Sequence, residues 1–442
     1  MAVEEIGLDL AKGAVEVIRV QGIASDGTGV GHLTDGRTVF VPRTAPGDEV
    51  RIRVTKLERK WARGRVLEVL TPTEDRADPL CPSYGECGGC ALQHISYDDQ
   101  LLWKSRFVHD ALKRIAHLDL SPTSVHPSPE RYHYRSRVTF TLIRLPGGRV
   151  VSGFHRLDRP DRIVDVAEAC VLPVPAVAAA WKDLQSTWGD GARRLPSGRR
   201  LRLTLREVDE GVILVIEGGK GTGRPDILLK EVEGLVAVWA TRADGGGRLL
   251  AGLADGHDTR LGEVLSAGPA AFTQVNDAAA GALHQLVLDE VHKSSARVVV
   301  DAYCGAGLYG RKVAKEDCLA IGIELNAAAA RAAGRDAPEG FSVLTGAVEE
   351  RLSEALPADV VILNPPRGGV DERVTALLRD EGPSKVIYVS CDPATLARDL
   401  ARLGSSYDVA GLHAFDLFPQ TAHVEVLAIL ERAAVTATAA GG

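Results

Sequence analysis

The sequence lacks the features that mark membrane, exported and disordered proteins. Its 442 residues contain no apolar run near the ~18 residues that a membrane-spanning helix requires. The first residues, MAVEEIGLDL, have acidic charges where a signal peptide is basic, so we expect a cytoplasmic protein. Hydrophobic residues at 45% and charged residues at 25% are typical of globular domains and argue against disorder.

A net positive charge is also absent. The formal charge of -7 at pH 7 makes attraction of the whole molecule to nucleic acid improbable, so such binding would need a local basic surface. Seven cysteines, an odd number, favour metal or nucleophile chemistry over disulfides in a long intracellular chain. At roughly 100–200 residues per domain, the length predicts several domains.

The N-terminal part alternates short strands with turns such as SDGTG and APGDE, which is typical of a small β-barrel. Within it, residues 51–65 contain seven Lys or Arg and one acid, Glu58, around Trp61. The basic residues are Arg51, Arg53, Lys56, Arg59, Lys60, Arg63 and Arg65. This segment could follow an RNA backbone and stack a base, or it could be a solvated basic hairpin. A second basic cluster at 193–206 leaves the same two alternatives open.

The C-terminal part alternates short apolar runs with helical stretches. Five continuous runs, from ARVVVDAYC to KVIYVSC, are typical of buried parallel strands. Two more, YDVAGLHAFDLF and HVEVLAILE, are separated only by PQTA, too short for a crossover, so they should be antiparallel. We therefore predict an α/β protein with four segments: a β-barrel at 1–72, a mixed α+β central domain at 73–270, a doubly wound domain of seven strands at 271–435, and a frayed tail at 436–442.

Ligands of such sheets bind outside the carboxyl ends of the strands. There the first strand leads into DAYCGAGLYG, a G-x-G-x-x-G turn containing Gly305 and Gly307, and the second ends at Glu324, which can accept ribose hydroxyls. NAD and S-adenosylmethionine both fit this pattern. The fourth strand ends in Asn364-Pro-Pro-Arg, a rigid polar turn that favours methyl transfer, with an NAD-linked oxidoreductase as the alternative.

Two candidate catalytic residues lie at the same rim. Cys391 follows the fifth strand, and the helix that begins after Asp392 should lower the pKa of its thiol. A small buried cysteine without chemistry is the alternative. Glu425, two residues after His423, should begin the last strand at this rim, where it could act as a base.

The other cysteines predict a metal site. Cys81, Cys87 and Cys90 form a C-x5-C-x2-C loop with interspersed glycines, and Cys170 follows later in the chain. Four thiolates can hold tetrahedral zinc or a four-iron cluster, and the spacing leaves both open.

Together these motifs resemble the S-adenosylmethionine-dependent RNA 5-methyluridine methyltransferases. The match extends over nearly the whole chain, with a TRAM-like (OB-like) barrel, the cysteine-bearing central domain, DAYCGAGLYG, NPPR, VSCDPATLARDL and FPQTAHVEV. SCDP with FPQTxHVE is highly specific, whereas the glycine turn alone is weak. The resemblance implies a Rossmann-like methyltransferase domain in which Cys391 adds to carbon 6 of uracil and Glu425 removes the hydrogen from carbon 5.

The resemblance also implies ligands and partners. The cofactor-binding residues would be Gln274, Tyr303, Gly305, Gly307, Glu324 and Asn364. It favours a [4Fe-4S] cluster over zinc on the four cysteines, and an RNA substrate, 23S ribosomal RNA first and the tRNA T-loop second, for a monomer. Asn364 replaces the family's usual Asp, as Ala347 and Leu308 replace polar residues. Asn-Pro-Pro is typical of amino-group methyltransferases, which stay an alternative, as does an RNA-binding protein with a decayed site.

Overall fold

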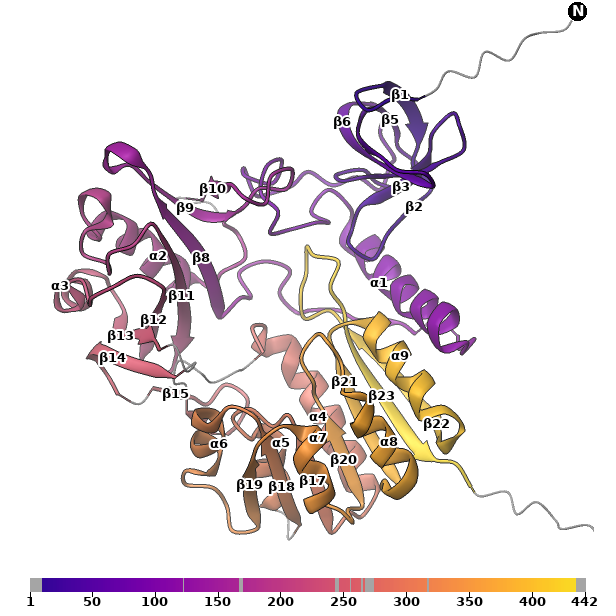
Figure 1. Ribbon diagram of the computed structural model, residues 1–442, viewed down its shortest axis with the longest axis vertical. Coiled ribbons are helices and arrows are strands. Elements are labelled where there is room, and N and C mark those ends of the chain that lie inside the picture. The colour runs from indigo at the N-terminus through magenta and orange to yellow at the C-terminus, as the bar shows by residue number, and fades with distance from the viewer. Residues whose placement is uncertain are drawn as a thin grey trace, which may run out of the picture.

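Three large β-sheets follow one another along the chain in the computed structural model (Figure 1). It describes residues 10–434, except 122, 167–169, 243–245, 255, 264, 267–273, 316 and 317. The predicted tail at 436–442 and the predicted boundary at 270/271 lie outside these described residues. Within them, no helix is long and apolar enough to cross a membrane.

The first sheet is the predicted N-terminal barrel. Its strands are β1 (Val15–Arg19), β2 (Gly22–Ile23), β3 (Gly29–His32), β4 (Thr38–Val41), β5 (Glu49–Leu57) and β6 (Trp61–Thr71), in the order β1-β5-β6-β4-β3-β2. Along β5 the aliphatic Val50, Ile52 and Val54 are buried and alternate with exposed arginines. This period of two lets one face form the barrel core while the other stays in water.

The segment after the barrel packs on the C-terminal domain, although the sequence placed it in the central domain. Helix α1 (Tyr97–Ala111) begins at Ser96, whose Oγ accepts a hydrogen bond from Asp99 N, and continues into the π-helical turn Leu112–Ala116. Strand β7 (Val125–His126) joins the edge of the C-terminal sheet beside β22 (Tyr407–Phe415). In Figure 1, α1 lies between the barrel and the C-terminal helices.

The central domain is mixed α+β. Its sheet contains β8 (Arg137–Arg144), β9 (Val150–His155), β10 (Ile163–Asp165), β11 (Arg200–Val208), β12 (Gly211–Glu217), β13 (Leu235–Thr241) and β14 (Gly247–Gly252), with helices α2 (Pro175–Thr187) and α3 (Pro225–Glu231). Phe140 of β8 stacks on Trp181 of α2 with ring centroids 3.8 Å apart, which fixes the helix on the sheet. A small pair, β15 (His257–Asp258) and β16 (Leu265–Ser266), follows.

The C-terminal sheet contains all seven predicted strands. They are β17 (Val298–Ala302), β18 (Leu319–Glu324), β19 (Phe341–Thr345), β20 (Val360–Leu363), β21 (Lys385–Ser390), β22, and β23 (Glu425–Arg432). The order is β19-β18-β17-β20-β21-β23-β22-β7, and β23 pairs antiparallel with both of its neighbours. Strands β20 and β21 are buried throughout, which explains their continuous apolar sequences.

Helices cover both faces of this sheet, as a doubly wound fold requires (Figure 1). They are α4 (Asp277–Lys293), α5 (Leu308–Ala314), α6 (Ala327–Gly334), α7 (Val348–Arg351), α8 (Glu372–Glu381) and α9 (Pro393–Leu403). Short 3-10 turns lie at Pro146–Gly148, Asp190–Ala192, Leu352–Glu354 and Gly404–Ser406. The doubly wound, Rossmann-like architecture expected from the sequence is therefore present.

Candidate active site

Strand register brings the predicted cofactor-binding residues to one edge of the sheet. Ala302 of β17 pairs with Ile323 of β18 and with Leu363 of β20. The residues that follow these three, Tyr303, Glu324 and Asn364, therefore lie side by side at the carboxyl ends of the strands.

The glycine turn between β17 and α5 is tightly constrained. Gly307 has φ +82°, and a Cβ there would lie 2.9 Å from the Phe341 ring. At Gly310 a Cβ would lie 2.2 Å from the same ring, so only glycine lets α5 pack this close to β19. The backbone of Tyr303 also adopts the left-handed conformation, with φ +63°, which is uncommon for a residue other than glycine.

Glu324 fixes this turn from the neighbouring strand. Its carboxylate accepts hydrogen bonds from Gly305 N (3.0 Å) and Asn326 N (2.7 Å). Beside it, Leu325 is 72% exposed, a large apolar surface at the predicted cofactor edge that the sequence analysis did not single out. Asp301 is buried, and its Oδ2 accepts a hydrogen bond from Gly310 N (2.9 Å). Its Oδ1 has no hydrogen-bond partner among the described residues.

Gln274 lies where the central domain leads into α4. Its side chain is only 7% exposed, and the preceding residues 267–273 lie outside the described ranges. Two residues on, Asn276 caps α4 by accepting a hydrogen bond from Ala279 N (3.2 Å). Ser136 N donates to Val275 O (2.9 Å), which ties this segment to the central sheet.

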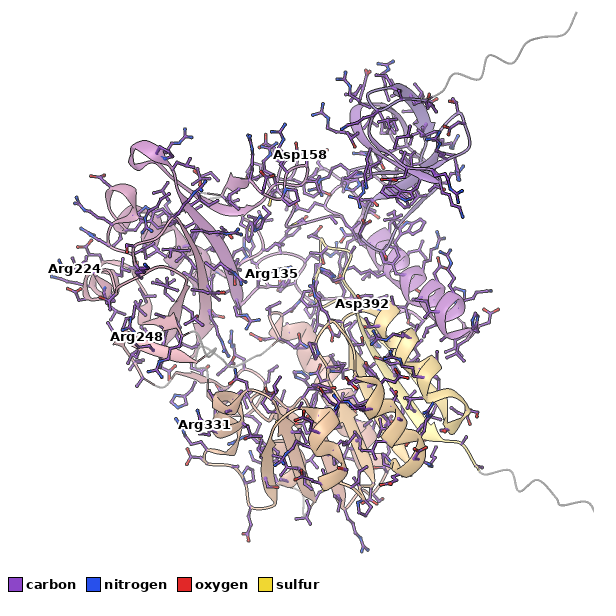
Figure 2. All side chains as sticks on the ribbon, viewed as in Figure 1. Arg135, Asp158, Arg224, Arg248, Arg331 and Asp392 are labelled. Atoms are coloured by element: carbon purple, nitrogen blue, oxygen red, sulfur yellow. The ribbon has the colours of Figure 1, made fainter. Side chains whose placement is uncertain are left out.

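Cys391 and Glu425 lie opposite each other at the end of two paired strands. Ser390 of β21 is the register partner of Val426 of β23, and in an antiparallel pair the next position outward joins Cys391 with Glu425. Cys391 is half-buried, whereas Glu425 is only 2% exposed. Figure 2 shows the adjacent Asp392 at the end of the C-terminal domain that faces the barrel.

The electrostatics of this pair differ from the sequence prediction. Burial raises the pKa of Glu425 to about 8, against the opposing effect of the Arg367 guanidinium. Burial and the charge of Glu425 raise the pKa of Cys391 to about 11, with Arg367 again acting in the lowering direction. The prediction of a lowered thiol pKa is wrong, because burial of Cys391 and the charge of Glu425 outweigh the lowering effect of Arg367. The Asp392 carboxylate, which caps the α9 N-terminus by accepting from Ala394 N (2.8 Å) and Thr395 N (3.1 Å), also acts in the raising direction.

Arg367 and its loop form a part of the site to which the sequence analysis gave no role. The exposed Arg367 donates to His423 Nε2 (3.3 Å), which joins the NPPR turn to the segment before β23. The loop behind it is held by fully buried Asp399 of α9, whose Oδ2 accepts from Val370 N (3.0 Å) and Tyr388 OH (2.8 Å). The same helix therefore begins just after Cys391 and holds the loop that follows the Asn364 turn.

The four predicted metal ligands line one cavity. Cys81, Cys87, Cys90 and Cys170 surround a space of about 40 Å³, together with Arg135 and Phe154. Among the described residues, no group of three or more His, Cys, Asp or Glu is already placed to hold a metal ion. Burial raises the pKa of Cys90 to about 11 and that of Cys170 to about 12.

Arg43 of the barrel contacts this cysteine loop directly. Arg43 donates to Cys87 O (2.7 Å) and Cys90 O (2.6 Å), and its guanidinium stacks 3.6 Å from the Tyr84 ring centroid. In Figure 2, Arg135 lies on the side of the central domain that faces the C-terminal domain, whereas Arg224 and Arg248 lie on its outer side.

The basic hairpin of the barrel is exposed, although Arg51 pairs with Glu68 and Lys56 with Glu58 (2.9 Å). Arg53 and Arg65 are exposed register partners, and Lys56 pairs in the same way with Arg63. Like charges directly opposite each other are unfavourable in the free protein, which favours an anionic partner.

Arginines of the second basic cluster, at 193–206, form ion pairs with acids of the central domain. Arg194 pairs with Glu231 (2.6 Å), Arg202 with Glu217 (3.1 Å), and buried Arg206 with Asp258 (3.3 Å).

Comparison with known proteins agrees with this geometry. Residues 349–433 match the tRNA (uracil-5-)-methyltransferase family, and residues 10–67 match the TRAM domain. An uncharacterized RNA methyltransferase of Thermosynechococcus vestitus is 34% identical over 95% of this chain and 98% of its own. One of Gloeobacter violaceus is 33% identical over 96% and 98%.

A solved structure is similar over nearly the same length. The Pyrococcus abyssi tRNA (uracil-54, C5)-methyltransferase in complex with S-adenosyl-L-homocysteine aligns with a TM-score of 0.70 at 26% identity, over 93% of this chain and 99% of that one. The fold and the site thus define an S-adenosylmethionine-dependent RNA methyltransferase. The chain belongs to the RNA methyltransferase family of these relatives, and its residues 349–433 match the uracil-5 family, which argues against the NAD-linked alternative.

Proposed function

We propose that this enzyme methylates carbon 5 of a uridine through a covalent bond between Cys391 and carbon 6 of the ring. The observation that supports this is the pairing of Cys391 with Glu425 at the rim beside the Gly305 turn. A nucleophile and a base on adjacent strands can act on neighbouring carbons of one pyrimidine.

The chemistry follows from the weak nucleophilicity of uracil carbon 5. The Cys391 thiolate adds to carbon 6, and the electron pair of the carbon 5–carbon 6 double bond moves onto carbon 5 and O4 as an enolate. S-adenosylmethionine, when bound, supplies an electrophilic methyl group to that carbon. Glu425 then accepts the hydrogen of carbon 5 as a proton, the double bond re-forms, and the carbon–sulfur bond breaks to release the thiolate. Glu425 returns its proton to solvent.

The charges around the pair suit these steps. A carboxyl with a pKa of about 8 is close to the value that general base catalysis at neutral pH favours. The Arg367 guanidinium opposes the rise in the pKa of both groups, so it favours the ionised thiol and the ionised carboxylate. We assign Arg367 this electrostatic role.

The residues at the sheet edge fit S-adenosylmethionine. Each oxygen of Glu324 accepts one backbone N–H and retains lone pairs for a ribose hydroxyl. Exposed Leu325 offers an apolar surface to an adenine ring, and the partnerless Oδ1 of Asp301 leaves an acceptor below the turn. Gln274, Tyr303, Gly305, Gly307 and Asn364 complete the proposed set.

We also propose that Cys81, Cys87, Cys90 and Cys170 hold a [4Fe-4S] cluster. Their shared cavity exceeds the ~10–15 Å³ that a single water needs, and half-buried Arg135 beside it can offset negative charge. Such a cluster would act as a rigid cross-link and not as an electron carrier, because methyl transfer requires no oxidation or reduction. Anaerobically purified protein should be brown and contain iron and sulfide, whereas a colourless protein with one zinc would contradict the assignment.

For the RNA, we propose 23S ribosomal RNA, with the tRNA T-loop as the second candidate. The combination of barrel and cysteine loop supports the first, and the Pyrococcus relative supports the second. In either case the target base must leave its stack to reach Cys391, which explains the need for separate RNA-holding surfaces.

Nucleoside mass spectrometry tests the proposal. Unmodified ribosomal RNA and tRNA are incubated with enzyme and S-adenosylmethionine, digested, and mapped by fragment, with Cys391→Ala as the control. We expect 5-methyluridine at a defined ribosomal position only with the unaltered enzyme. A product confined to the T-loop would select the second substrate, and methylation elsewhere than carbon 5 would overturn the proposal.

A further inference from the structure

The loop between β22 and β23 is held by residues far away in the sequence. It runs from Asp416 to Val424 and leads directly into Glu425. Figure 1 shows it in yellow, extending from the C-terminal sheet toward α1 and the barrel. Gln420 O accepts hydrogen bonds from Ala91 N (2.9 Å) and Leu92 N (3.0 Å), the residues that follow Cys90. The cysteine loop therefore contacts the loop that precedes the proposed base.

Two glutamines form the centre of this contact. Gln100 Nε2 donates to Gln420 Oε1 (3.0 Å), and Gln420 N donates back to Gln100 Oε1 (3.0 Å). Gln100 Nε2 also lies within hydrogen-bond distance of Leu92 O (3.1 Å) and Ile95 O (3.0 Å). Both glutamines are only 2% exposed, so a lost bond could not be replaced by water. Gln420 also has φ +69°, a conformation that its contacts must maintain.

A buried ion pair holds the start of the same loop. Lys104 Nζ lies 2.5 Å from Asp416 Oδ1 and 3.1 Å from Phe418 O, and the side chains of Lys104 and Asp416 are both fully buried. Tyr134 OH adds a bond to Pro419 O (3.0 Å). Since a buried charge without its partner is strongly unfavourable, Lys104 keeps the loop on α1 and leaves Gln420 facing Gln100.

The two catalytic candidates differ in how they are supported. Cys391 directly follows β21, a fully buried strand in the middle of the sheet, whereas Glu425 is the first residue of β23 and directly follows the loop that α1 and the residues after Cys90 hold in place. We propose that Gln100 is a positioning residue for Glu425, acting through Gln420, and that it couples the cysteine loop to the proton-removal step. This rests on the proposed function. A weakened Gln100–Gln420 pair should slow proton removal while leaving the attack by Cys391 nearly unchanged.

The test compares two reactions of one variant. Gln100→Glu keeps the size of the side chain but removes the NH₂ donor, and Gln185→Glu is the matched control, since Gln185 donates to Ser152 Oγ (3.1 Å) in the central domain. RNA containing 5-fluorouridine measures attack, because the methylated adduct has no hydrogen on carbon 5 to lose and stays covalent. Uridine RNA measures complete turnover.

For Gln100→Glu we expect adduct formation within about twofold of the unaltered enzyme and turnover at least about tenfold slower, with covalent methylated complex accumulating on uridine RNA. Gln185→Glu should match the unaltered enzyme in both reactions. Unchanged turnover in Gln100→Glu, or an equal fall in both reactions, would overturn the inference. If Gln100→Glu does not fold, Tyr134→Phe, which removes the hydrogen bond to Pro419 O, serves as the second variant. Its turnover should also fall more than its rate of adduct formation, by a smaller factor than in Gln100→Glu. No adduct with the unaltered enzyme would instead refute the proposed function.

Discussion

Ser390 pairs with Val426 across β21 and β23, and this contact sets the thiol of Cys391 opposite the carboxyl of Glu425. The Glu425 carboxylate disfavours ionisation of the Cys391 thiol, since two negative charges would lie close together with little water. With a pKa of about 8 for Glu425 and about 11 for Cys391, both groups are mainly protonated in the free enzyme at pH 7. Arg367 is the cation that counteracts this.

The activity should therefore depend on pH through Glu425. A base must be ionised to accept a proton, so turnover should rise between pH 6.5 and about 8 as Glu425 ionises. In Arg367→Gln the rise should move to higher pH, because Arg367 lowers the pKa of Glu425. Steady-state rates across a series of buffers check both statements. A pH-independent rate, or a shift to lower pH in Arg367→Gln, would contradict them.

Glu425 should also reduce stability at alkaline pH. Its pKa is raised in the folded state, so below the unfolded pKa of about 4.3 both states are protonated and pH has no effect. Between that value and 8 the unfolded chain loses its proton first, so stability falls as pH rises. The difference in free energy of unfolding between Glu425→Gln and the unaltered protein should therefore favour the variant by about 2 kcal/mol or more at pH 8.5 relative to its value at pH 5. Thermal unfolding at the two pH values measures this, and an equal effect at both would contradict it.

Asp399 should control the loop behind Arg367. It neutralises Arg398 and Arg402 and accepts from Val370 N, so Asp399→Asn leaves these cations uncompensated and should cost about 3 kcal/mol. Turnover should fall about tenfold as the Asn364 turn shifts. Tyr388→Phe, which removes one hydrogen bond to Asp399, should cost about 1 kcal/mol. Denaturant unfolding and steady-state kinetics test both variants, and full activity in Asp399→Asn would contradict the role.

The basic hairpin should contribute to RNA affinity and not to chemistry. In Arg53→Ala/Arg65→Ala, KM for RNA should rise, kcat should stay constant, and the slope of log affinity against log salt should decrease by about 1.5. The single variant Arg51→Ala is the control, because Arg51 already pairs with Glu68 and should matter less. Binding titrations at several salt concentrations measure the slope. An unchanged slope would favour the plain solvated hairpin.

The sequence predicted the sheets and the rim, because apolar periodicity and strand ends are local features. It could not predict β7, a strand of two residues that pairs with β22, or the attachment of α1 to α9. The Lys104–Asp416 and Gln100–Gln420 contacts join residues about 300 positions apart, so no local pattern marks them. The direction of the Cys391 pKa shift was missed because the burial of Cys391 and of the neighbouring Glu425 depends on tertiary packing, and because the α9 cap is itself an acid.

The covalent step is the centre of this account. The most direct measurement is mass spectrometry of the enzyme after incubation with S-adenosylmethionine and RNA containing 5-fluorouridine. We expect a stable adduct whose RNA fragment maps to Cys391 and which is absent from Cys391→Ala, while Glu425→Gln still forms it. A folded enzyme that binds cofactor and RNA but forms no adduct, or attaches RNA at another residue, would contradict the account.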